Sequence, residues 1–328
     1  VPEDAAATNR VKIVAGHDSD PATISTEGNL GVLAGIPFDR IIMPPTFTEA
    51  TLPGPIAHAG GIAYVSDGAT KGWVGSMDGA WQKFTTTSIA ILAETQALID
   101  AGWSPSNTVK FKVDDAIRNL KFTGLWSKML AIWGSTSLLN WKNPGLYPMV
   151  AVGSPVRVAD SHFAGTGNDA NYWETNLSPK DNGGGIYTLT SGVIWNWSLT
   201  DSISDTAAEM GFSTSVKLQA KIANGKMQGA LNSGNSFGDP VTNSLGLSGV
   251  ARTGTNTAFT FKNGTINKLV TNDAVISNIA TGTLKLGRSE AGTGSARQMA
   301  FAGIGGGSAW TQTNVQDLYN ILNTYLTA

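Results

Sequence analysis

Two Asn-Gly pairs, Asn224-Gly225 and Asn263-Gly264, each join two short segments in which apolar and polar residues alternate. Asn-Gly favours the two-residue turn of a β-hairpin, because both residues accept the positive φ angles that this turn requires. Similar turn dipeptides recur at short intervals throughout residues 138–328. The pattern predicts many short antiparallel strands, which in a segment of this length favour a β-sandwich or jelly roll.

The residues before this segment predict two further parts. Residues 1–35 show no clean periodicity and are expected to form an extended N-terminal arm. Residues 36–86 combine a proline-rich stretch with the turn pairs Asp67-Gly68 and Asp78-Gly79, which predicts a small antiparallel β module. Its strands are expected near residues 62–66, 72–76 and 80–84.

Helical periodicity appears twice in the chain. Residues 87–137 predict two or three amphipathic helices that form a collar or linker, the last following an apolar stripe from Leu125 to Trp133. Near the end of the sequence, Leu318 and its apolar neighbours share one helical face. Thr313 and Gln316 there fit a capping box, which predicts where this helix begins.

The glycine cluster at residues 303–307 precedes that helix, as in a phosphate-binding loop. It does not complete the G-x-G-x-x-G pattern that dinucleotide binding requires. The cluster is therefore expected to end a core strand, from Met299 to Ile304, where neighbouring backbones pass closely.

Composition excludes several classes of protein. The net charge is −2 and no long run of Lys or Arg occurs, so a nucleic-acid partner is not expected. No stretch is apolar enough for membrane insertion, and the first residues lack the features of a signal peptide. Cysteine is absent, which removes disulfides and thiolate chemistry. Charged residues make up only 14% of the chain. A surface with so few charges is typical of β-rich extracellular or virion proteins.

Aromatic residues are the most suggestive candidates for a binding site, because sugar rings stack on flat aromatic faces. The chain has 10 Trp residues. The candidates for carbohydrate binding are Tyr172, Trp173, Trp195 and Trp197. Trp195 and Trp197 share one face of a predicted strand, and filling the core between two sheets is the favoured interpretation of that pair. Trp173 and Trp310 are expected to be partly exposed.

Catalytic and metal-binding patterns are weak. The acids of residues 138–328 show no paired spacing on a predicted strand, and Glu174, Asp181 and Glu209 are the ones whose positions would test a glycosidase. No cofactor is expected. A structural Ca²⁺ is conceivable, but turn chemistry is the favoured explanation of its possible ligands, which are Asp169, Asn171, Asp181 and Asn182.

The C-terminal pattern resembles the concanavalin A-like, laminin-G-like lectin sandwich. The segment FTFKNGTINKL resembles the hairpin of that family, Leu286-Gly287-Arg288 matches the end of the next strand, and Thr313 to Tyr319 matches its short helix. The resemblance implies a mainly β fold, with an antiparallel sandwich and a terminal helix, preceded by the helical linker and the small β module. Residues 138–328 would form this sandwich.

The N-terminal part resembles virion proteins of tailed bacteriophages. The segment TEATLPGPIAHAGGIAYVSDGATKGWVGSMDGAWQKF is similar to a module of tail-fibre and other particle proteins. The resemblance implies a non-enzymatic structural protein of the phage particle, of the tail-fibre, head-fibre or decoration type, located at the particle surface. The arm and small module would contact other virion proteins, and a homo-oligomer is expected, with a trimer favoured.

The sandwich would face outward and bind host-surface glycan, or it would only decorate the particle. Two alternatives remain from the sequence. One is a polysaccharide depolymerase on the same sandwich, and the other is a secreted bacterial adhesin.

Overall fold

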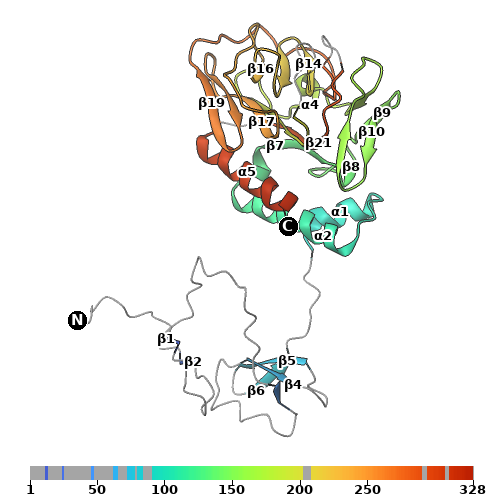
Figure 1. Cartoon of the computed structure of the whole chain (residues 1–328), viewed down its shortest axis with the longest axis vertical. Helices are drawn as coiled ribbons and strands as arrows, with labels where there is room; N and C mark the ends of the chain where they lie inside the picture. Colours follow the sequence, from blue (N-terminus) through green and yellow to red (C-terminus); the bar gives the residue numbers. More distant parts are fainter. Residues whose placement is uncertain are drawn as a thin grey trace, which may run out of the picture. The chain divides into compact units, whose positions relative to one another are not determined.

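The computed structural model describes residues 91–201, 208–289, 294–306 and 310–327, together with six short strands before residue 91 (Figure 1). The chain divides into two units, residues 1–89 and residues 90–328.

The strands of the first unit form two small sheets. β1 (Lys12–Ile13) pairs with β2 (Ile24–Ser25), and the rest of the predicted arm lies outside the described residues. The second sheet has the order β3-β4-β5-β6, with one parallel pair, β3 and β4, and antiparallel pairs after it. Three of its strands are those predicted from the turn pairs. The bounds are β3 (Thr46–Phe47), β4 (Ile62–Val65), β5 (Gly72–Met77) and β6 (Ala80–Lys83).

The second unit is the predicted antiparallel sandwich. Within its described residues, one sheet has nine strands in the order β10-β11-β21-β13-β17-β18-β19, with β7 and β8 attached through β21. These strands are β7 (Met129–Gly134), β8 (Ser137–Asn140), β10 (Val156–Val158), β11 (His162–Ala164), β13 (Gly192–Ser198), β17 (Gly246–Arg252), β18 (Ala258–Lys262), β19 (Thr265–Val270) and β21 (Met299–Gly305).

The other sheet has six strands among the described residues, in the order β16-β15-β14-β20-β12-β9. They are β9 (Val150–Val152), β12 (Tyr172–Glu174), β14 (Met210–Ser213), β15 (Val216–Gln219), β16 (Gln228–Leu231) and β20 (Lys285–Leu286). The helices are α1 (Ala93–Asp100), α2 (Asn107–Phe122), α3 (Leu125–Lys128), α4 (Pro179–Asn182) and α5 (Gln312–Thr327).

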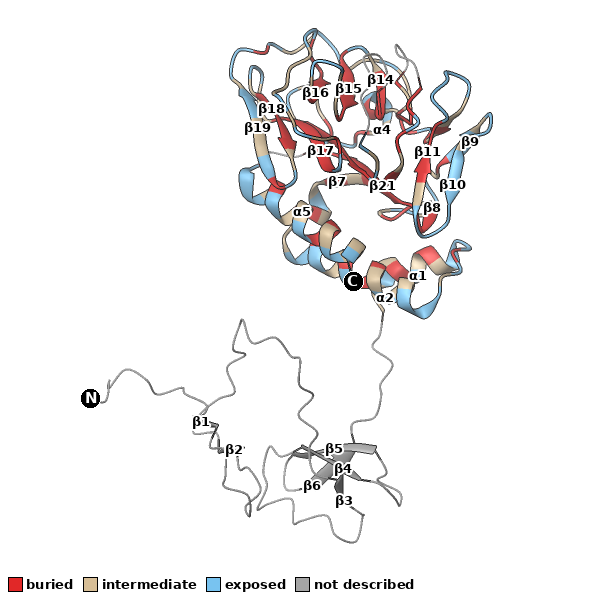
Figure 2. Ribbon diagram, viewed as in Figure 1, coloured by how far each residue is buried: buried red, intermediate tan, exposed pale blue. Residues whose placement is uncertain are grey.

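Two apolar layers hold this unit together. One lies between the two sheets, and the other lies between the nine-stranded sheet and α1, α2, α3 and α5 (Figure 2). Strand β13 contributes to both, because successive side chains point to opposite faces. Ile194 enters the layer between the sheets, whereas Val193, Trp195 and Trp197 enter the layer beneath the helices. The tryptophan pair is therefore core, as favoured, but it lies on the other side of the sheet from the expected one.

The stripe from Leu125 to Trp133 corrects a prediction, because a helix was expected over its whole length. Helix α3 ends at Lys128, and Met129–Gly134 is strand β7, which pairs with β21. The strand is buried on both faces: Ile132 packs towards the helices and Trp133 between the sheets. A run that is apolar on both faces cannot be distinguished from a helix by periodicity alone. The collar expected for 87–137 consequently packs within the same unit as the sandwich.

The terminal helix is present, but its cap lies two residues before the predicted one. Thr311 Oγ1 accepts a hydrogen bond from Asn314 N (3.3 Å), and Asn314 Oδ1 accepts one from Thr311 N (3.3 Å). This reciprocal pair satisfies amides of the first turn. The fully buried Leu318 and Leu322 then fix the helix against the nine-stranded sheet.

The glycine cluster before α5 does end a core strand. Gly303 lies in β21 opposite Trp195 of β13. A Cβ atom at this position would come within 2.2 Å of Trp195 Cζ2. Glycine is therefore required here for close packing of the indole against the neighbouring strand.

Candidate functional site

A shallow pocket of about 320 Å³ opens at one end of the nine-stranded sheet. Four segments that are distant in the sequence form it: the end of β13, the loop that leads into β17, the β18–β19 turn and α5. Its walls are Trp197, Ser198, Leu199, Asn243, Leu245, Gly246, Asn263 and Tyr319.

The aromatic wall consists of Trp197 and Tyr319. The rings are stacked, with centroids 5.5 Å apart and an angle of 14° between their planes. Trp197 is only 7% exposed, whereas Tyr319 is half-buried. The wall is rigid on one side because Trp197 is anchored in the sheet, and it reaches solvent at its edge through Tyr319.

The carbonyl of Leu245 anchors the rim of the pocket. Lys262 Nζ donates to this oxygen (2.6 Å), and Asn263 Nδ2 also donates to it (3.3 Å). Lys262 Nζ donates a second hydrogen bond, to Ser248 Oγ (3.0 Å). Burial lowers the pKa of the Lys262 amine to about 7, although the negative charge of Asp201 opposes this shift.

Gly246 and Asn263 complete the rim through unusual backbone conformations. Gly246 has a φ of 84° and Asn263 a φ of 45°, both in the left-handed region. A Cβ atom on Gly246 would lie 2.2 Å from Asn263 Oδ1. Asn243 Oδ1 accepts a hydrogen bond from Leu245 N (3.1 Å), which fixes the entry to the strand. The amide side chains thus sit beside the aromatic wall in defined positions.

Of the predicted carbohydrate-binding residues, only Trp197 lines this pocket. Trp195 is fully buried against Gly303. Trp173 is 4% exposed, and its Nε1 donates to Ala164 O (3.3 Å), so the expectation of partial exposure is wrong. It is wrong for Trp310 also, which is buried and stacks on Phe261. Trp173 belongs to the apolar layer between the two sheets, and Trp310 to the layer beneath the helices.

Tyr172 lies in β12, in the other sheet, where Arg288 sits over its ring at 5.2 Å. Arg288 Nη1 also donates to Asp169 O. The four predicted aromatic residues therefore do not form one site.

The possible calcium ligands all accept hydrogen bonds within the fold, Asp181 and Asn182 inside one turn and Asp169 and Asn171 from segments further away in the sequence. Asp169 Oδ1 accepts from Gly294 N, Asn171 Oδ1 accepts from Ser154 N, and Asn182 Oδ1 accepts from Ser178 N. Asp181 Oδ2 accepts from Ser178 Oγ (2.6 Å). In the described part of the chain, no three His, Asp or Glu side chains come together as metal ligands would.

The acids that would test a glycosidase are also engaged in the fold. Glu209 is fully buried, pairs with Arg297, and accepts a hydrogen bond from Ala220 N (2.6 Å). Glu174 Oε1 accepts from Asn176 N (3.0 Å) in the turn after β12. Their contacts are those of a structural ion pair and a turn.

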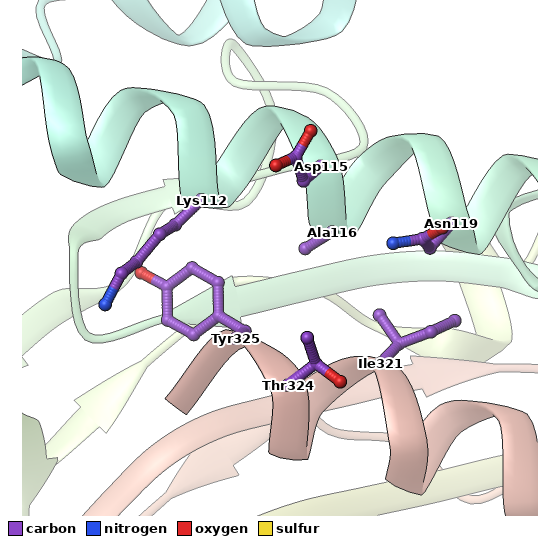
Figure 3. A pocket seen from close by; sticks show the side chains of 7 residues that line it. All are labelled: Lys112, Asp115, Ala116, Asn119, Ile321, Thr324 and Tyr325. Carbon is purple, nitrogen blue, oxygen red and sulfur yellow. The ribbon is translucent and has the colours of Figure 1, made fainter. Parts of the chain in front are cut away.

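A second, much smaller pocket of about 60 Å³ lies between α2 and α5 (Figure 3). Figure 3 shows Lys112 extending alongside the ring of Tyr325. That ring packs edge-on against Phe301, 5.0 Å away, and burial raises its pKa to about 12. This small space is a gap in the packing between two helices.

No family profile and no curated protein sequence matches the chain. Solved structures do show similarity. A Trypanosoma rangeli sialidase in complex with 2,3-difluoro-KDN has a TM-score of 0.43 and 8% identity, covering 66% of this chain and 40% of the sialidase. Domain 4 of a GH43 extracellular arabinanase from Geobacillus stearothermophilus, with arabinotriose, has a TM-score of 0.44 and 13% identity, covering 58% of this chain and 98% of that domain.

A third structure is that of botulinum neurotoxin type C, whose cell entry depends on interaction with two ganglioside molecules. Its TM-score is 0.46 and its identity 10%, covering 61% of this chain and 53% of that one. This chain thus spans less than two thirds of the sialidase and the toxin structure.

The similarities correct one expectation. The sequence predicted a protein without enzymatic activity, but the similar structures include a sialidase and a domain of an arabinanase. The prediction that the protein has no enzymatic activity is therefore wrong. Glycan hydrolysis should accordingly be measured together with glycan binding. In the described part of the chain, none of the helices combines the length and apolar character needed to cross a bilayer.

Proposed function

We propose that the sandwich binds glycan in the pocket of Trp197 and Tyr319, and that the protein is a structural component of a phage particle, a fibre or decoration protein. The observation that carries the binding proposal is the aromatic wall beside two asparagine side chains in an open pocket. The lectin-like unit would face outward and bind glycan of the host surface.

The chemistry of the pocket supports glycan binding. The C–H faces of a sugar ring pack on aromatic side chains, while its hydroxyl groups need paired donors and acceptors. Asn243 and Asn263 provide amide groups that are held by the Leu245 backbone, Asn243 through the N–H and Asn263 through the carbonyl. Because the rim is anchored by three hydrogen bonds to the Leu245 backbone, little ordering would be needed on binding.

The particle setting is supported by the sequence. The segment from Thr48 to Phe84 resembles a module of phage particle proteins, and its strands β4, β5 and β6 form an antiparallel sheet. On this proposal, residues 1–35 and 36–86 contact other virion proteins, and the chain assembles as a homo-oligomer with a trimer favoured. Imaging intact particles tests it: density that places residues 1–35 away from any other chain contradicts docking through the arm.

A glycan array probed with the full chain tests the binding proposal. Tyr319→Ala should abolish the array signal, whereas Asn320→Ala, at an exposed position on the same helix, should leave it unchanged. Circular dichroism checks that both variants remain folded. A signal that survives Tyr319→Ala places binding elsewhere, and a blank array across bacterial polysaccharides contradicts glycan binding. Release of reducing sugar from the bound polysaccharides is measured in parallel.

A further inference from the structure

The pocket presents no charge to a ligand. None of the residues that line it is Asp, Glu, Lys, Arg or His. The charged groups near it are engaged in hydrogen bonds: Lys262 Nζ donates to Leu245 O, and Asp201 Oδ1 accepts from Ser244 N (2.9 Å) and Ser244 Oγ (3.2 Å). Lys221 Nζ lies 3.8 Å from Asp201 Oδ1. A carboxylate or sulfate on a ligand would therefore lose water without meeting a cation among the lining residues.

The rim carries an apolar surface that a plain hexose does not need. Leu199 is 36% exposed and Leu245 is 40% exposed, and both line the pocket next to the aromatic wall. A single exposed leucine is ordinary on a protein surface. Two at the mouth of one pocket, continuous with Trp197 and Tyr319, form an apolar patch that hydroxyl groups would leave poorly covered. A methyl group is the sugar substituent that fits it.

The amide groups offer complementary polar atoms. Asn243 Nδ2 has no hydrogen-bond partner in the described part of the chain, because only its Oδ1 is used, by Leu245 N. Asn263 uses its Nδ2 for Leu245 O, which leaves Oδ1 as an acceptor beside Gly246. One donor and one acceptor suit hydroxyl groups or an N-acetyl amide.

We infer that the pocket selects an uncharged sugar residue that carries a methyl-bearing substituent, either an N-acetyl group or the methyl of a 6-deoxy sugar. The inference rests on the proposed glycan binding and names the class of sugar that this pocket takes. The methyl group covers Leu199 and Leu245 while the ring lies on the aromatic wall.

Titration calorimetry with matched sugars tests the inference on the full chain. The pairs are glucose with N-acetylglucosamine, galactose with 6-deoxygalactose, and glucose with glucuronic acid. A buried methyl group should improve the dissociation constant by about fourfold. The acid should bind more weakly than glucose. Whichever methyl-bearing partner is preferred identifies the source of the methyl group.

The variant Leu199→Ser with Leu245→Ser should remove the preference within the methyl pair, so that the methyl-bearing sugar and the plain hexose bind with similar dissociation constants. Leu269→Ser is the matched control, because Leu269 is an exposed leucine that does not line the pocket. Unchanged melting temperatures show that the variants fold. Tyr319-dependent binding without a methyl preference, or with glucuronic acid as the better ligand, overturns this inference alone. Absence of any Tyr319-dependent binding overturns the proposed function, and the inference falls with it.

Discussion

The indole of Trp197 and the phenol ring of Tyr319 lie nearly parallel, with 5.5 Å between their centroids. Trp197 belongs to the central strand β13 and Tyr319 to the terminal helix α5. The same contact therefore fixes the helix to the sheet and builds the wall of the pocket. Substitutions at 319 can separate these two roles.

Tyr319→Phe should keep both roles, because the ring remains and the hydroxyl makes no hydrogen bond within the described part of the chain. Tyr319→Ala should lower the free energy of unfolding by about 1–3 kcal/mol, through the loss of a half-buried ring and its stacking. Urea unfolding measures both. Equal destabilisation by the two substitutions would mean that the hydroxyl, not the stack, holds the helix.

Leu318→Asp should abolish cooperative unfolding of the sandwich unit. Leu318 is fully buried in the layer between α5 and the nine-stranded sheet, so an aspartate there would leave an unpaired buried charge. Asn320→Asp, exposed on the same helix, is the control and should shift the melting temperature little. Thermal denaturation followed by circular dichroism distinguishes them, and a melting temperature retained by Leu318→Asp would contradict this packing.

Asp273→Asn should cost about 3–5 kcal/mol of stability, because Arg252 is completely buried and Asp273 is its partner. Arg252 Nε also donates to Leu231 O (2.7 Å) and Nη1 to Asp273 O (2.9 Å), so the guanidinium cannot move to solvent. The exposed pair of Lys268 and Asp239 is the comparison: Asp239→Asn should cost under about 1 kcal/mol. Denaturant unfolding measures the loss of stability in both variants. Similar losses in Asp273→Asn and Asp239→Asn would contradict the special role of the buried pair.

Lys262→Met should stabilise the protein more at pH 6 than at pH 10. Burial lowers the pKa of this amine to about 7, below the ordinary lysine value of 10.5. Between these values the unfolded chain binds the proton that the folded chain releases, so stability rises with pH across this window. The stability is therefore lost progressively as pH falls from 10.5 to about 7, and the loss is complete below that, where both states carry the proton. The measurement is the difference in unfolding free energy between wild type and variant at each pH, and a difference independent of pH would show that Lys262 stays solvated.

Much of the sandwich could be predicted from local patterns. The alternation of Val193, Ile194 and Trp195 identified strand β13, and Asn263-Gly264 identified the turn between β18 and β19. These features depend on neighbours in the sequence, so the sequence is sufficient for them. Strand β7 was predicted as helix because its conformation depends on β21. That strand is distant in the sequence and supplies the hydrogen bonds that β7 needs.

The candidate site was much harder to predict. Trp197 was among the candidates, but Asn243, Leu245 and Tyr319 were not, because their proximity depends on how four segments meet. Tyr319 stood out only as part of the apolar face of a helix. Trp173 shows the converse, since a position that was expected to be partly exposed is buried in the apolar layer between the two sheets.

Strand β21 has a consequence for how the protein is made. It lies between β13 and β11 and also pairs with β7, yet it is the last strand of the sheet to be synthesised. While the ribosome is still translating residues before Met299, β7 and β13 have no partner between them. The sandwich therefore cannot close during most of its translation. The apolar strands of the nascent chain must avoid associating with one another until β21 has been synthesised.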